Sequence, residues 1–126
     1  MDNCTLPEYY GPGTVSVLLG NGDGTFQSAV SYSTGAWAPD SVVIADVNGK
    51  GYPDLVLANT CQAYGCANGE VSVLVGNGSG KFPAAVTYNS GGQDLYRSSI
   101  AVGDLTGNGY PDVIAANETS ASVGVL

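Results

Sequence analysis

One stretch of the chain, residues 46–54, places oxygen-bearing side chains at alternate positions. It reads DVNGKGYPD and offers Asp46, Asn48 and Asp54, while Lys50 stands where a further oxygen would complete the series. Calcium is held in proteins by carboxylate, amide and backbone carbonyl oxygens around a bend that glycine relieves. A lysine ammonium cannot ligate a cation and would repel it or replace its charge. The stretch is therefore either a weak calcium loop or a turn held by side-chain hydrogen bonds.

A second stretch, residues 104–112, repeats the pattern as DLTGNGYPD without the lysine. The alternate side chains here are Asp104, Thr106, Asn108 and Asp112, and each of them carries an oxygen. Only two of the four are charged, and fewer charges predict weaker calcium binding. This stretch is the better candidate metal site of the two, with a metal-free turn as its alternative.

Both stretches belong to an internal repeat. VSVLLGNGDGTF at 15–26 recurs 56 residues later, and DVNGKGYPDLVLAN at 46–59 recurs 58 residues later as DLTGNGYPDVIAAN. SVGVL at 122–126 reads as the start of one more copy. The chain, 1–126, is therefore predicted to hold two units of 56–58 residues that begin within a unit, followed by a partial third.

Each unit is predicted to form four short strands. Gly is abundant at 19 of 126 residues, and short runs of Val, Ile, Thr and Tyr alternate with turn residues, which favours an all-β fold. In the middle unit the strands are expected near 41–46, 54–58, 71–76 and 83–89. Apolar content is highest in the first strand and lowest in the fourth, so burial is expected to fall in that order, as in a propeller blade whose inner strand lines the hub.

The repeated strings carry a family resemblance. The unit is similar to the FG-GAP/VCBS repeat, which builds the β-propeller of integrin α-subunits and of many bacterial surface proteins. The resemblance implies blades of four antiparallel strands, about two per chain, and a cell-adhesion or ligand-binding role outside the cell or at its surface. It also implies calcium in the loop between the first two strands, with the carbonyls of Tyr52 and Tyr110 as further ligands.

The loops of such a blade divide between two ends of the molecule. The first-to-second and third-to-fourth loops share one end, while the remaining connections share the other, where the two units differ most and aromatic residues gather. The candidate ligand-binding residues at that other end are Trp37, Asp40, Tyr64, Asp94, Tyr96 and Arg97. Such a mixture could stack on and hydrogen-bond a glycan or a peptide. The alternatives are packing of Trp37 between blades and an ion pair between Arg97 and a nearby acid.

Three cysteines are present, and two of them, Cys61 and Cys66, lie close together in CQAYGC. Because the chain has no histidine, a zinc site of the usual Cys/His kind is poorly supported. A small disulfide in an oxidising compartment is favoured, with two reduced thiols as the alternative. Cys4 is left over.

The net charge of −8 argues against several classes of partner and activity. Nucleic acid and anionic membrane surfaces are disfavoured because the chain has no Lys/Arg patch. Neither a membrane-spanning run nor a signal peptide is expected. The absence of histidine and of a G-x-S-x-G motif predicts a module that is not an enzyme.

Assembly is the last expectation. Propellers typically have about four to eight blades, and this chain has strands for little more than two. Because unpaired sheet edges seek partners, a homo-oligomer is predicted, in which three or four chains close head to tail into a ring. The alternative is a piece of a longer propeller. For function, the alternatives to ligand binding are a purely structural self-assembling repeat and a fragment of a propeller enzyme.

Overall fold

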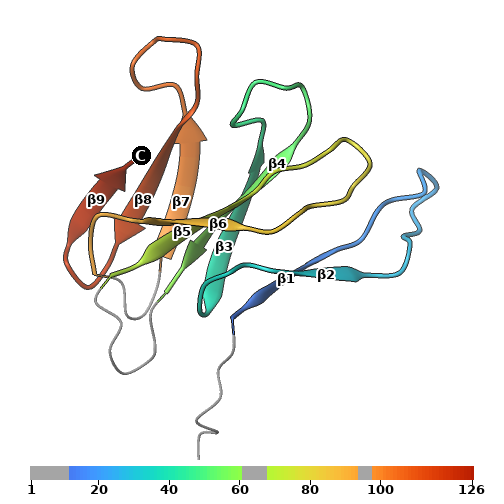
Figure 1. Ribbon diagram of the computed structural model, residues 1–126, viewed down its shortest axis with the longest axis horizontal. Helices are drawn as coiled ribbons and strands as arrows, with labels where there is room; N and C mark the ends of the chain where they lie inside the picture. The colour runs from blue at the N-terminus through green and yellow to red at the C-terminus, as the bar shows by residue number, and fades with distance from the viewer. Residues whose placement is uncertain (1–11, 61–67, 94–97) are drawn as a thin grey trace, which may run out of the picture.

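The computed structural model describes residues 12–60, 68–93 and 98–126, which form nine strands in three antiparallel sheets and no helix (Figure 1). The first sheet pairs β1 (Thr14–Val17) with β2 (Val30–Ser33). The second has the order β3 (Pro39–Ala45), β4 (Asp54–Asn59), β5 (Glu70–Leu74), β6 (Val86–Asn89), and the third the order β7 (Ser98–Gly103), β8 (Asp112–Asn117), β9 (Ser122–Val125). The all-β prediction is confirmed, and the sheets are consistent with propeller blades.

The strands of the middle unit lie close to their predicted positions. The largest difference is at β6, which begins at Val86 although a strand was expected from residue 83. Pro83 has no backbone N–H to donate to a neighbouring strand, so pairing with β5 starts only after it. The four strands follow one another in the sheet in chain order, as an up-and-down blade requires.

Two apolar clusters join the three sheets. Leu55, Leu57 and Leu74 pack against side chains of the first sheet, among them Val15 and Val17. The second cluster joins the second and third sheets, and its buried members are Val56, Val71, Val113 and Ala115. Alternate residues of β4 therefore pack against different neighbouring sheets, which buries this strand on both faces.

The predicted fall in burial from first strand to fourth is wrong for the first strand. Every residue of β4 is buried, whereas Val42 and Ile44 of β3 are 50% and 68% exposed. The physical reason is position: β4 lies between two sheets, while β3 is the edge strand of its own sheet and has one open face. The fourth strand, β6, is exposed throughout, as predicted.

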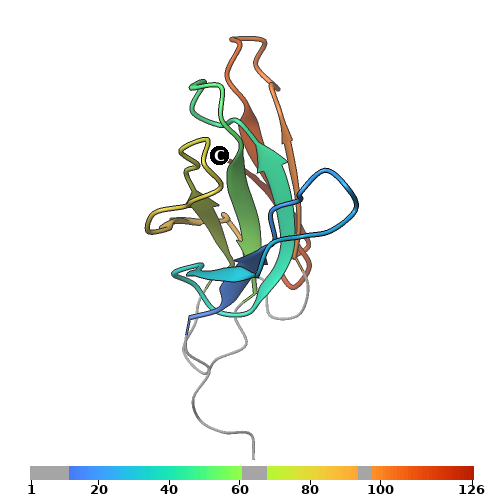
Figure 2. The ribbon, with the colours of Figure 1, turned by 90° about the vertical axis from the view of Figure 1, so that its right-hand side faces the viewer.

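The connections divide between two ends, as the strand order predicted. Loops 46–53 and 104–111 lie at the top of Figure 1 and stay together in the turned view of Figure 2, and loop 75–85 lies to the right of loop 46–53 in Figure 1. Connections 34–38 and 118–121 lie at the opposite end. None of the described residues forms a helix long and apolar enough to cross a membrane.

Candidate functional site

The two candidate calcium loops have nearly the same backbone. Four glycines at equivalent positions adopt the left-handed region that side chains disfavour. Their φ angles are 70° and 71° for Gly49 and Gly107, and 82° and 86° for Gly51 and Gly109. Glycine at these positions is what allows both loops to bend in the same way.

In the first loop, Asp46 closes the bend. Its Oδ1 accepts a hydrogen bond from the Lys50 N–H at 3.2 Å, and its Oδ2 accepts one from the Gly51 N–H at 2.7 Å. The Asn48 Oδ1 also accepts from the Lys50 N–H, at 3.0 Å. These bonds are what the turn alternative required, and they involve two of the candidate ligands.

In the second loop, Asp104 performs the same task with more bonds. Its Oδ1 accepts from the N–H groups of Gly107 at 2.7 Å and Asn108 at 3.2 Å, and its Oδ2 accepts from Gly109 at 2.8 Å. The Gly109 N–H above all holds the pKa of the Asp104 carboxyl below its ordinary value, although desolvation acts in the opposite direction. The Asn108 Oδ1 accepts from the Tyr110 N–H at 2.8 Å.

The last aspartate of each loop differs in its surroundings. Asp54 is fully buried; its Oδ2 accepts from the Val47 N–H at 2.9 Å and its Oδ1 from the Gly76 N–H at 2.8 Å. It therefore ties the first loop to the segment that follows β5. Asp112 is only half-buried, and its Oδ2 accepts from the Leu105 N–H at 2.7 Å.

The donor set of the second loop fits a hard cation better than that of the first. Its candidate side chains all carry an oxygen, and the Oδ2 atoms of Asp104 and Asp112 each accept one N–H, which leaves each a lone pair for a metal. The Thr106 hydroxyl lies 3.5 Å from the Asp104 Oδ1, to which it donates. Within the described ranges no three His, Cys, Asp or Glu side chains group together, so a cation would also need amide, hydroxyl and carbonyl oxygens. In the first loop, Lys50 leaves one of the alternate positions without a side-chain oxygen that could bind a metal.

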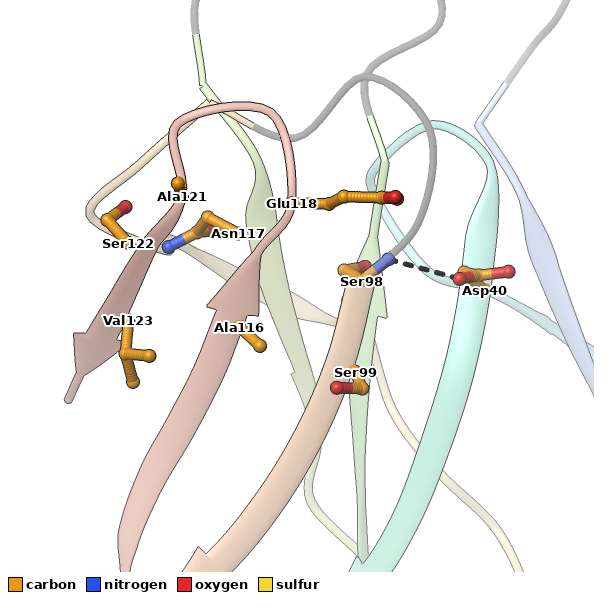
Figure 3. A pocket seen from close by; sticks show the side chains of 9 residues that line it. All are labelled: Asp40, Ser98, Ser99, Ala116, Asn117, Glu118, Ala121, Ser122 and Val123. Atoms are coloured by element: carbon orange, nitrogen blue, oxygen red, sulfur yellow. Dashed lines mark hydrogen bonds between the residues drawn. The ribbon is translucent and has the colours of Figure 1, made fainter.

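At the opposite end, the structure describes two of the six predicted ligand-binding residues. Trp37, in the connection from β2 to β3, is 37% exposed. Asp40 is exposed at the start of β3, and its Oδ2 accepts a hydrogen bond from the Ser98 N–H at 3.1 Å (Figure 3). This bond joins the second sheet to the third. The other predicted residues, Tyr64, Asp94, Tyr96 and Arg97, lie outside the described residues, as do Cys4, Cys61 and Cys66.

A pocket of about 460 Å³ opens beside Asp40 at this end. Its lining comes from β3, from β7, and from the segment that runs from β8 into β9 (Figure 3). The lining residues are Asp40, Ser98, Ser99, Ala116, Asn117, Glu118, Ala121, Ser122 and Val123. Glu118 points from the β8–β9 connection toward the side where Asp40 lies. The charged residues among the described lining are Asp40 and Glu118, both of them acidic.

One wall of the pocket is held by bonds that cross between sheets. The Ser90 hydroxyl donates to the Asn117 Oδ1 at 2.6 Å, and the Asn117 amide donates back to the Ser90 carbonyl at 3.3 Å. Gln93 and Ser120 exchange two further bonds, at 3.1 and 3.2 Å. The connection after β6 is thereby fixed against the β8–β9 turn, which positions the residues around Glu118.

Sequence reasoning selected Asp40 but missed Glu118 and Ser98. Ser98 is 8% exposed, and its hydroxyl has no hydrogen-bond partner among the described residues. The available signal for Glu118 was its place in a connection between second and third strands, because such connections lie at the end where the two units differ most. It was passed over because nothing in the sequence joins it to Asp40, 78 positions earlier.

The FG-GAP-like repeat family matches this chain twice, over residues 5–57 and 46–115. The two matches overlap at the first candidate calcium loop and together span most of the sequence. The chain belongs to the FG-GAP-like repeat family. No curated protein and no solved structure gives a match. Membership supports a β-propeller-like repeat module; the repeats of this family are generally non-enzymatic and typically extracellular.

Proposed function

We propose that this FG-GAP module is a non-catalytic binding module, located outside the cell or at its surface, that takes a ligand at the pocket beside Asp40. The observation that carries the proposal is that two acidic residues, Asp40 of the second sheet and Glu118 of the connection between β8 and β9, line one pocket at the end where the two units diverge. Loops on a rigid scaffold are the usual place for such a site.

The chemistry of the lining suits a ligand rich in hydrogen-bond donors. Carboxylates accept bonds from sugar hydroxyls or from an ammonium group, and the Ser and Asn side chains can both donate and accept. Ala116 and Val123 supply apolar surface for the carbon face of a sugar ring. A glycan is therefore the ligand class proposed first, and a peptide or protein surface the second.

A glycan array followed by calorimetric titration of each hit tests this function. Asp40→Asn and Glu118→Gln should each weaken binding at least several-fold, because each removes a charged acceptor. Glu70→Gln, on β5 and outside the pocket lining, is the matched control and should leave binding unchanged. Binding that both pocket variants retain at full strength would refute the site, and turnover of a bound glycan would favour the enzyme alternative.

Trp37 offers an independent readout because it is the only tryptophan in the chain. It lies in the β2–β3 connection, at the same end as the pocket. If it contacts ligand as the sequence suggested, its fluorescence should change on titration, and Trp37→Ala should weaken binding without lowering stability much. A variant that loses stability and keeps its affinity would instead assign Trp37 to packing.

Calcium is proposed as the cofactor, mainly at the second loop. The support is the shared glycine-dependent backbone and the all-oxygen donor set. The ligands proposed there are Asp104, Thr106, Asn108, the Tyr110 carbonyl and Asp112. The weaker first site would use Asp46, Asn48, the Tyr52 carbonyl and Asp54. A bound ion would cross-link the two ends of each loop and stiffen it.

A second candidate function, structural self-assembly, is favoured by an open apolar face on the third sheet. Val123 and Val125 of β9 are 65% and 61% exposed. Their equivalents in β5, Val71 and Val73, pack against the third sheet. By analogy the β9 face would receive another blade, which a second copy could supply in a ring of three or four chains. Native mass spectrometry tests this: a trimer or tetramer supports the ring, and a monomer at every concentration counts against it.

A further inference from the structure

Five Asn-Gly pairs occur in the chain, and the asparagine of each is exposed in a loop of the described structure. They are Asn21-Gly22, Asn48-Gly49, Asn68-Gly69, Asn77-Gly78 and Asn108-Gly109. The Gly69 N–H is held by the Gly92 carbonyl at 2.9 Å, and Gly69 is buried. Asparagine before glycine is chemically labile because the next backbone nitrogen meets no Cβ as it approaches the side-chain amide carbon. The surroundings of each pair differ, so the structure predicts which one reacts.

Attack on the amide is helped when a donor already holds the side-chain carbonyl, since negative charge develops on that oxygen. The Asn48 Oδ1 accepts from the Lys50 N–H at 3.0 Å, and the Asn108 Oδ1 accepts from the Tyr110 N–H at 2.8 Å. Asn77 is held in the same way by Ser79. These three pairs are therefore alike in the hydrogen bond that activates the side-chain amide carbon.

The pairs differ in the hydrogen bonding of the backbone N–H of the glycine, whose nitrogen attacks the amide. The Gly109 N–H donates to the Asp104 carboxylate at 2.8 Å and must leave that bond before its nitrogen can react. The Gly49 N–H makes no hydrogen bond with any described residue, since Asp46 holds the N–H groups of Lys50 and Gly51 instead. A bond to a charged acceptor is strong enough to slow the reaction about tenfold or more.

We propose that Asn48 is a deamidation site and that Asp104 protects Asn108 from the same reaction. The Gly49 nitrogen forms a bond to the Asn48 Cγ, ammonia leaves with the amide nitrogen and the Gly49 proton, and a succinimide results. Water then opens the ring at either carbonyl, which gives aspartate or isoaspartate. No oxidant or other co-reactant is needed.

The aspartate product changes the chemistry of the first loop. It places a carboxylate at the alternate position between Asp46 and Lys50, where the parent chain has a neutral amide. Resting on the proposed calcium role of this loop, we expect the deamidated loop to bind a divalent cation more tightly, because the added charge offsets that of Lys50. Deamidation would then convert the weaker loop into a working site over time.

The test is incubation of the whole chain in mildly alkaline buffer, with peptide mapping by mass spectrometry at intervals. Asn48 should deamidate about tenfold faster than Asn108, with Asn77 close to Asn48. In an Asp104→Ala variant, the Asn108 rate should rise toward that of Asn48, while the Asn48 rate in the same sample stays constant as the internal control. Equal rates in the parent chain, or an Asn108 rate unmoved by the substitution, would overturn the assignment.

The consequence for the metal is tested separately with calcium alone in a calorimeter. Asn48→Asp should bind calcium several-fold more tightly than the parent chain. Asn77→Asp adds the same charge outside both loops and should not. If Asn48→Asp shows no gain, the new carboxylate does not serve the cation and that part of the proposal fails. The deamidation rates would still decide the first part, so the two failures are distinguishable.

Discussion

The two calcium-type loops share a backbone but differ in what their last aspartate does. Asp54 is buried and bonds to N–H groups on two separate segments, whereas Asp112 is half-buried and bonds to its own loop. The first loop also carries Lys50 where the second has Asn108. The same nine-residue pattern therefore ties its loop to a second segment in the first copy, whereas in the second copy the bonds to both aspartates come from within the loop.

The largest effect on stability should come from removing the buried carboxylate of Asp54. Asp54→Ala leaves the N–H groups of Val47 and Gly76 without their acceptor, at a cost of roughly 2–4 kcal/mol of unfolding free energy. Asp112→Ala loses a single hydrogen bond that is more exposed, so it should lower the unfolding free energy by about 1 kcal/mol or less. Urea denaturation of both variants measures the difference. Equal losses would mean that the two aspartates are equivalent and that burial does not distinguish the loops.

The second prediction concerns the lysine. Lys50→Asn makes the first loop resemble the second, and removing the positive charge should tighten calcium binding there about tenfold. Lys81→Asn makes the same charge change in the β5–β6 loop and is the matched control. Calorimetry in an Asp104→Asn background isolates the first loop. A gain of the same size in both lysine variants would reduce the effect to overall charge.

The comparison also separates what the sequence could predict from what it could not. The repeated glycines predicted that both loops bend alike, because few other residues adopt their positive φ. The pairing of Asp54 with Gly76 was not predictable, since it joins segments 22 positions apart that meet only after β4 and β5 pair. For the same reason Asp40 could be predicted as a candidate, but Glu118 could not be predicted to line the same pocket, because it lies in a connection of another sheet.

Strand burial shows the same limit. The apolar run of β3 matched that of β4, and both were expected to be buried. Periodicity reports the side-chain pattern of a strand and not its place in the sheet. Only the packing of three sheets revealed that β4 has neighbours on both faces while Ile44 of β3 remains exposed.

A third prediction tests whether the two backbones are truly equivalent. Alanine at Gly51 or Gly109 meets no atom within 4 Å, so its cost comes from the positive φ alone. Both substitutions should therefore destabilise by about 1 kcal/mol. Gly103→Ala, in open space without a positive φ, should be close to neutral. Thermal denaturation of the three variants checks this, and a much larger loss at one loop would show that its bend is under other constraints.

The smallest effect is a pH dependence that belongs to the second loop. Because N–H groups led by that of Gly109 lower the pKa of Asp104 in the folded state, its stabilising contribution is complete above the unfolded value of about 3.9. That contribution is lost as the pH falls through the lower folded pKa. Asp104→Asn should flatten the acid side of the stability curve in calcium-free buffer, whereas Asp112→Asn keeps the bonds to Asp104 and should preserve its titration. If the stability curve of Asp104→Asn at low pH matches that of the parent chain, the hydrogen bonds that close this loop do not depend on the charge of Asp104. The oxygens of the second loop would then be held no differently from those of a simple turn.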